Sequence, residues 1–313
     1  MAIIARKMIG SFARMAAILL ACRVFHAATF AQTAAVSVVP DADTYVRSAV
    51  PSGNYGVGGA LAVSGLAAVN GSGQTNGQFE TLMRFPTSAV IAQFDAAFGT
   101  NNWTLTSIQL ALTETGSPDN SIFNRGVGSF EVRWLQFDGW IEGTGKPSGA
   151  TSDGAAWQDI PAMTNAVADV SLGIFTNRGT DGPVTLDLPR SEKLVNDIAA
   201  GGEVTLYLPP ISSTIGFTFN SRNFGNTNAQ PRLNIWARVN APVLNATQVQ
   251  PGEITLRFPT VANWTYTVER AEATTGPWLD VFNLPARSTN GTALLTQGLT
   301  NAAGFFRLRS SKE

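Results

Sequence analysis

The stretch Phe130-Glu131-Val132-Arg133-Trp134 decides the fold, because its apolar and charged side chains alternate strictly. Successive residues of an extended chain point to opposite faces, so this pattern predicts a β-strand with one face against a core. The same period of two recurs between clusters of Gly, Asn, Pro and Ser that are typical of turns. Strands of this kind pack as two sheets face to face, which predicts an all-β sandwich. The other strands expected before Asn240 are 36–39, 44–47, 61–64, 79–85, 107–113, 184–188, 204–208, 215–219 and 233–237.

Two segments interrupt the alternation and have the spacing of short helices. Residues 88–98 carry apolar side chains three and four positions apart, with Ser88 as the expected N-cap and Gly99 as the end. A second such pattern follows Ser191, its expected N-cap, and ends at Gly201. We expect both helices to cover an open end or edge of the sandwich.

The first 31 residues have the three parts of an export signal. Arg6 and Lys7 form a basic start, Met15 to Ala21 an apolar run, and Thr29 to Ala31 a small-x-small cleavage site. The apolar run is too short to span a bilayer. The sequence therefore predicts a signal peptide over residues 1–31 and an extracellular or cell-surface protein without a membrane span.

A lipobox is the alternative interpretation of the same segment. Leu19-Leu20-Ala21-Cys22 would make Cys22 the lipid-anchored first residue of a lipoprotein. We favour cleavage after Ala31, because the flanking pattern fits it better.

Cleavage after Ala31 would remove the only cysteine, Cys22, and the only histidine, His26. The mature chain would then have no disulfide, no Cys or His metal ligand, no thiolate nucleophile and no Ser-His-Asp triad. It would also lose four of the 21 Lys and Arg, which leaves 17 against 22 Asp and Glu, a net charge of −5. A mildly acidic surface does not attract nucleic acid.

A second, smaller unit is expected from Asn240, where Asn240-Ala241-Pro242 interrupts the pattern. Alternation resumes at 253–258 and 265–270, and further strands are expected at 278–281 and 305–309. About 70 residues suit a small immunoglobulin-like sandwich. The predicted domains are therefore 32–239 and 240–313.

The first domain contains several motifs in a fixed order: Asp43-Thr44-Tyr45-Val46, Asn54-Tyr55-Gly56, Met83-Arg84-Phe85, Phe94 to Gly99 before Asn102-Trp103, Asp138 to Gly143, and Phe219 to Phe224 before Pro231-Arg232-Leu233. Through these motifs it resembles the DNRLRE-type module of secreted bacterial proteins, a jelly-roll β-sandwich related to carbohydrate-binding modules. Asn223 departs from the family pattern, which often has an acid after the Ser-Arg pair. The second domain resembles fibronectin type III-like repeats through Tyr266 to Arg270, Pro277-Trp278 and Phe305 to Leu308. The resemblance implies glycan binding or cell-surface assembly.

Candidate ligand-binding residues are aromatic side chains in loop-like contexts and one arginine. Tyr55, Trp140 and Trp157 could stack on sugar rings, and Arg222 could grip a carboxylate in a bidentate manner. Packing is the alternative role. We favour it for Trp140, which lies beside a strand, and leave Trp157 open, since the long stretch from Gly139 to Asn165 is either a binding element or an irregular crossover. For Arg222 we favour an internal ion pair with an acid such as Asp43 or Glu80.

Asp41 and Asp43 lie two apart and could hold a structural Ca²⁺ with backbone carbonyls, although turn capping and a salt bridge are the favoured roles. No other cofactor is expected.

The sequence thus predicts a non-catalytic module that binds polysaccharide or another cell-envelope glycan. The alternatives are a structural or adhesive protein of the envelope or extracellular matrix, and a polysaccharide-degrading enzyme with a carboxylate pair such as Asp138 with Glu142, or Asp153 with Asp159.

Overall fold

The computed structural model describes residues 33–70, 72–75, 77–115, 126–240, 242–250, 252–298 and 304–312. The predicted signal peptide and the Cys22 lipobox lie outside these residues. Backbone contacts divide the chain into two compact units. One contains Ala34–Phe94 and Leu105–Ala237, and the other contains Asp95–Thr104 and the chain from Arg238 onward. Because this division differs from the expected boundary at residue 240, the domain assignment stays a prediction.

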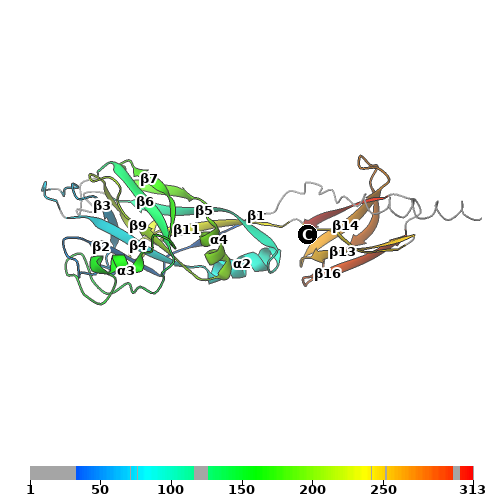
Figure 1. Cartoon of the computed structure of the whole chain (residues 1–313), viewed down its shortest axis with the longest axis horizontal. Coiled ribbons are helices and arrows are strands. Elements are labelled where there is room, and N and C mark those ends of the chain that lie inside the picture. The colour runs from blue at the N-terminus through cyan, green and yellow to red at the C-terminus, as the bar shows by residue number, and fades with distance from the viewer. Residues whose placement is uncertain are drawn as a thin grey trace, which may run out of the picture. The chain divides into compact units, whose positions relative to one another are not determined.

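The first unit is an antiparallel β-sandwich, as the alternating pattern predicted (Figure 1). Its strands connect in the order β1-β11-β5-β10-β3-β4-β9-β6-β7, with β2 paired to β4 and β8 paired to β5. The strands are β1 (Thr33–Val38), β2 (Ala42–Arg47), β3 (Ala60–Ser64), β4 (Phe79–Pro86), β5 (Trp103–Glu114), β6 (Gly128–Leu135), β7 (Val170–Asn177), β8 (Gly182–Leu188), β9 (Glu203–Leu208), β10 (Gly216–Asn220) and β11 (Arg232–Val239).

This sheet can form two layers because, at two points, neighbouring strands pair through a single pair of residues. Strand β10 pairs with β3 over five residues but meets β5 only at Phe219 and Glu114. Strand β3 meets β4 only at Ser64 and Phe79. The layers pack through large apolar side chains, such as Phe130 of β6, which stacks on Phe217 of β10 with ring centroids 5.2 Å apart. Both rings are about 1% exposed, so the alternation of β6 buries its apolar face as predicted.

A third layer covers the outer face of the sheet formed by β2, β4, β9 and β6. It is made by residues 136–169, here called the covering segment, which include the 3₁₀-helix η2 (Trp157–Asp159) and the helix α3 (Ile160–Met163). Trp140 and Ile160 of this segment form one apolar cluster with Leu82 and Tyr207 of the sheet. The stretch rich in Gly, Ser and Thr is therefore a packed crossover between β6 and β7.

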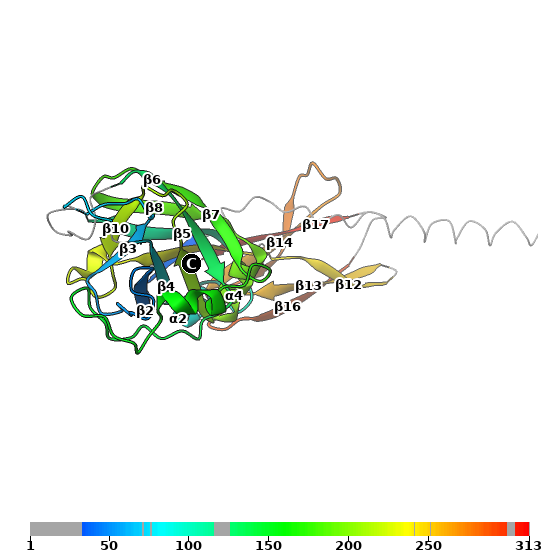
Figure 2. The same ribbon diagram turned by 60° about the vertical axis from the view of Figure 1, so that its left-hand side comes forward.

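Both predicted helices are present. Helix α2 spans Ser88–Phe98 and ends at Gly99, whose φ of 88° is left-handed. Ser88 is its first residue and not its N-cap, because the Thr87 carbonyl accepts the first helical bond, from the Ile91 amide. Figure 2 shows α2 beside α4, and the Thr87 hydroxyl donates to the Gly202 carbonyl at the end of that helix (2.7 Å).

Helix α4 spans Glu192–Ala200 and follows the predicted pattern in full. The Ser191 hydroxyl caps it by accepting from the Leu194 amide, and Gly201 ends it with a φ of 72°. Leu194 and Ile198 are buried. Across the described residues, no helix is both long and apolar enough to cross a bilayer.

The second unit contains two three-stranded antiparallel sheets, ordered β12-β13-β16 and β15-β14-β17. Phe258 of β13 packs on Tyr266 of β14, with ring centroids 5.5 Å apart, in the core between the sheets. The sequence pattern predicted four of these strands and missed β12 and β16. The strands are β12 (Asn245–Gln250), β13 (Glu253–Thr260), β14 (Trp264–Ala271), β15 (Leu279–Leu284), β16 (Gly291–Gly298) and β17 (Phe305–Lys312). In the first unit, a further 3₁₀-helix, η3 (Thr227–Ala229), lies between β10 and β11.

Candidate functional site

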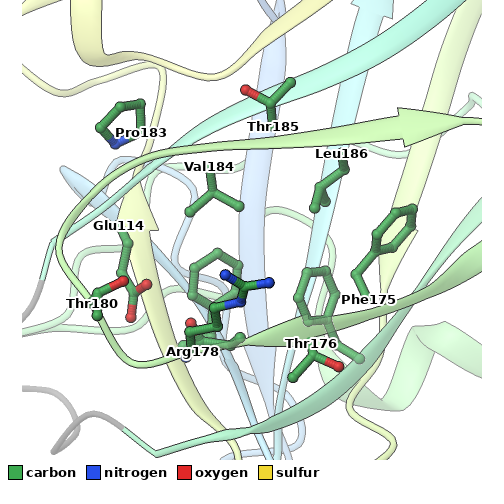
Figure 3. Close-up of a pocket in the computed structure, with 12 residues that line it drawn as sticks. Glu114, Phe175, Thr176, Arg178, Thr180, Pro183, Val184, Thr185 and Leu186 are labelled. Carbon is green, nitrogen blue, oxygen red and sulfur yellow. The ribbon is translucent and has the colours of Figure 1, made fainter.

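The best candidate for a binding site is a cleft of about 330 Å³ between β7 and β8. These two strands are consecutive in the chain and lie on the two sides of the open edge of the sandwich. Figure 3 shows side chains of both strands pointing into the space between them. The cleft is lined by Glu114, Phe130, Phe175, Thr176, Asn177, Arg178, Thr180, Pro183, Val184, Thr185, Leu186 and Phe217.

Aromatic and aliphatic side chains form the inner wall of this cleft. Phe130 and Phe217 belong to the sandwich core, and Phe175 of β7 is half-buried with its ring centroid 6.1 Å from that of Phe130. Val184 and Leu186 of β8 face them across the cleft (Figure 3). A concave apolar wall with a few polar groups is the usual composition of a small-molecule site.

The polar groups come from the ends of the strands and from residues 178–181, the connection between β7 and β8. Arg178 is exposed and has no hydrogen-bond or ion-pair partner among the described residues. The Thr180 hydroxyl has none among them either. Glu114, at the end of β5, is 3% exposed. The cleft therefore offers a cation, hydroxyl groups and one carboxyl group beside apolar rings.

Asn177 holds the connection in place. Its side-chain amide donates to the carbonyls of Gly126 (3.3 Å) and Gly216 (3.4 Å), and its Oδ1 accepts from the Gly179 amide (3.1 Å). The residue is 4% exposed, so these bonds lie out of water and fix the backbone on which Arg178 stands.

Tyr55 and Trp140, which the sequence offered as sugar-stacking candidates, are both buried. Tyr55 is 4% exposed and stacks on Tyr45, with ring centroids 4.6 Å apart, because its turn folds back under the covering segment. Trp140 is 3% exposed, and its Nε1 donates to Thr205 Oγ1 on the sheet (3.1 Å). Neither ring offers a face to a ligand. Burial of Trp140 agrees with the favoured packing role.

Trp157 lies half-buried in the covering segment, where it packs against the apolar cluster of Trp140 and Ile160. It does not line the β7–β8 cleft. Its ring therefore contributes to the third layer of the fold.

Arg222 is held by an internal acid, as favoured, but the partner is Glu142. Arg222 Nε and Nη2 each donate to one carboxylate oxygen of Glu142 at 2.6 Å, a bidentate pair. The pair joins the end of β10 to the covering segment. The guanidinium is thus occupied, which leaves it poorly suited to bind a ligand carboxylate.

Asp43 lies beside this pair and is fully buried. Its Oδ2 accepts from the Arg222 amide (2.6 Å), whereas its Oδ1 has no hydrogen-bond partner. Burial raises the pKa of Asp43 to about 7, and the nearby Glu142 carboxylate adds to the rise, although the amide of Arg222 opposes it.

The predicted calcium residues have separate partners. Asp41 pairs with Arg84 (3.1 Å), whereas Asp43 faces Arg222. No group of three or more acidic, His or Cys side chains suited to a metal occurs within the described ranges. A structural Ca²⁺ stays a prediction.

The carboxylates considered for catalysis are each bound locally. Hydroxyls of Thr144 and Thr151 donate to Asp153 and lower the pKa of its carboxyl to about 2. Asp159 accepts from the Ala156 amide (3.0 Å). Burial raises the pKa of Asp138 to about 6. None of these residues lines the β7–β8 cleft.

A buried acid and tyrosine form a further pair on the outer face of the sheet. The Tyr207 hydroxyl donates to Glu80, and Gln78 Nε2 donates to the other carboxylate oxygen (2.7 Å). Burial raises the pKa of both Glu80 and Tyr207. A raised pKa keeps the Tyr207 phenol protonated and makes it a weaker acid, so its hydroxyl serves as the hydrogen-bond donor that holds the buried Glu80.

Comparisons with known proteins identify no relative. No family model and no curated protein match the chain. Among solved structures, a beta-glucuronidase from glycoside hydrolase family 2 is similar at 7% identity and a TM-score of 0.21, over 86% of this chain and 27% of that one. A Macrobrachium rosenbergii nodavirus structure is similar at 8% identity and a TM-score of 0.21, over 93% and 92% of the two chains. Likenesses this weak carry no argument about function.

Proposed function

We propose that the chain is an exported, non-catalytic protein that binds a glycan in the β7–β8 cleft. The observation that carries the proposal is the combination of the half-buried Phe175 ring with the unpartnered Arg178 guanidinium at one concave site. A sugar has an apolar C–H face that packs on an aromatic ring and hydroxyls that bond to charged and hydroxyl side chains. The cleft offers both kinds of contact.

The composition of the cleft supports binding without hydrolysis. Glycoside hydrolysis by the usual route needs two carboxyl groups on either side of the bond. Glu114 is the only carboxyl group among the side chains that line the cleft. Export is supported by the basic start, the apolar run and the small-x-small site of residues 1–31.

Affinity electrophoresis tests the proposal. The protein is run in native gels that contain xylan, galactomannan, mixed-linkage β-glucan, alginate or polygalacturonate. We expect at least one polysaccharide to retard the protein. In Phe175→Ala and Arg178→Ala, the association constant derived from the retardation should fall about tenfold or more, a loss of about 1.4 kcal/mol or more in binding free energy.

Two variants outside the cleft serve as matched controls. Phe137→Ala removes a ring that is 43% exposed, and Arg238→Ala removes an exposed arginine. Circular dichroism checks that all four variants fold. Free migration of the wild-type protein in every gel would contradict the proposal, as would equal losses in the control variants.

A further inference from the structure

The β7–β8 cleft is closed by the chain at one end. Strand β7 ends at Asn177, strand β8 begins at Gly182, and the connection between them crosses from one to the other. Figure 3 shows this connection joining the two ribbons beside Arg178 and Thr180. A ligand that runs along the two strands toward this end meets the connection.

The closed end is also the polar end. Figure 3 places Glu114 and Thr180 there, near Pro183, with the Arg178 guanidinium reaching toward the middle of the cleft, whereas Phe175 and Leu186 lie toward the other end. The hydrogen bonds of Asn177 to Gly126, Gly216 and Gly179 hold the closed end in one conformation. The polar groups at this end therefore need little reorganisation to meet a ligand.

The terminal sugar of a glycan differs from an internal one by a free hydroxyl in place of a glycosidic bond. A site whose polar groups bond to that hydroxyl discriminates against a ligand that lacks it. We propose that the cleft binds the terminal unit of a glycan chain, with its free hydroxyl toward Thr180 and Glu114. This inference rests on the proposed function, because it concerns the same cleft.

The number of protein molecules bound per glycan chain tests the inference. The polysaccharide that retards the protein is partly hydrolysed and separated by size, and each fraction is titrated into the protein by calorimetry. We expect one protein molecule to bind for each chain end of the kind that the cleft recognises. The affinity should not change with chain length beyond the first few sugar units. Binding in proportion to chain length would overturn the inference while leaving the proposed function intact.

Reduction of the fractions with borohydride shows which end binds. Loss of binding assigns the reducing end, and unchanged binding at one protein per chain assigns the other end. If no polysaccharide retards the protein in the first place, the proposed function fails, and that result is distinct from the failure of end recognition.

A variant pair tests the role of the closed end. Thr180→Val keeps the shape of the side chain but removes the hydroxyl, and we expect it to weaken binding of short oligosaccharides about fivefold or more. Thr100→Val, at an exposed threonine outside the cleft, is expected to bind as the wild type does. Equal affinities of the two variants would show that the hydroxyl of Thr180 takes no part.

Discussion

At the scale of single residues, Asp43 is buried in a conformation that suits its neutral form. Its Oδ1 has no partner, and its pKa is raised from 3.8 to about 7, mainly because burial disfavours the charge. The folded state thus holds this proton more tightly than the unfolded state. The contribution of Asp43 to stability is greatest below about pH 4 and is lost as pH rises toward 7.

Asp43→Asn tests this dependence, because asparagine resembles the neutral acid and does not titrate. We expect the free energy of unfolding of the wild type, relative to the variant, to fall between pH 4 and 7 by up to about 1.4 kcal/mol per pH unit. Urea unfolding at several pH values measures it. The difference between the two proteins removes the contributions of Glu80, Asp138 and Asp197, whose pKa values are also raised. Parallel pH profiles would refute the assignment.

The ion pair of Arg222 and Glu142 is a second residue-scale case. Glu142→Gln removes the charge from a bidentate pair whose side chains are 33% and 15% exposed. We expect a loss of about 1–3 kcal/mol in the free energy of unfolding, because the arginine then lacks a charged acceptor.

Asp280→Asn is the matched control for Glu142→Gln. Asp280 pairs with Arg309 at 3.8 Å, with both side chains about half exposed, so its removal should cost about 0.5 kcal/mol or less. Urea unfolding compares the two variants, and similar losses would mean that the Arg222 pair does not stabilise the fold more than a surface pair does.

At the scale of elements, Asn54 fastens the covering segment to the sandwich. Its Nδ2 donates to the carbonyls of Glu142 (2.6 Å) and Ala155 (2.9 Å), and its Oδ1 accepts from Gly56 and Gly145. Gly143 has a φ of 76° and comes so close to Asn54 that a Cβ there would lie 2.2 Å from Oδ1. Three hydrogen bonds from this fully buried side chain thus hold the covering segment, and the fourth, from Gly56, holds Asn54's own turn.

Asn54→Ala is expected to loosen the covering segment before the rest of the fold. The loss of four hydrogen bonds leaves buried backbone groups without partners, which costs about 1–3 kcal/mol for each such group that water does not reach. Hydrogen exchange followed by mass spectrometry should show faster exchange in residues 136–169 than in the wild type. Asn228→Ala, at an exposed position, is the control. Unchanged exchange in the covering segment of Asn54→Ala would contradict this role.

Strand β7, which lines the β7–β8 cleft, is the element of the first unit that could not be predicted from sequence. Strand β7 contributes Phe175 and Thr176, but its sequence lacks the strict alternation of β6. Gly173 has a φ of 126° there, and the register with β6 shifts between Glu131 and Arg133. A bulge of this kind changes which side chains share a face, so a period of two is lost in the sequence although pairing continues.

At the scale of the whole molecule, the mature chain is expected to begin at Gln32 and to contain no cysteine. The intact mass of protein secreted from an expressing bacterium checks this expectation. The melting temperature should be the same with and without a reducing agent, because no disulfide can form. A mass that corresponds to a lipid on Cys22 would instead establish the lipoprotein interpretation and overturn cleavage after Ala31.

The sequence by itself determined the strands with clean alternation, the two helices with their glycine ends, and the all-β class. These are local properties, because the direction of each side chain follows from the few residues around it. Only the tertiary structure decided that Arg222 pairs with Glu142, that Tyr55 and Trp140 are buried, and that β5, β6, β7, β8 and β10 line a cleft. Those contacts join residues far apart in the chain, and they depend on strand order and register, which the alternation of a single strand does not specify.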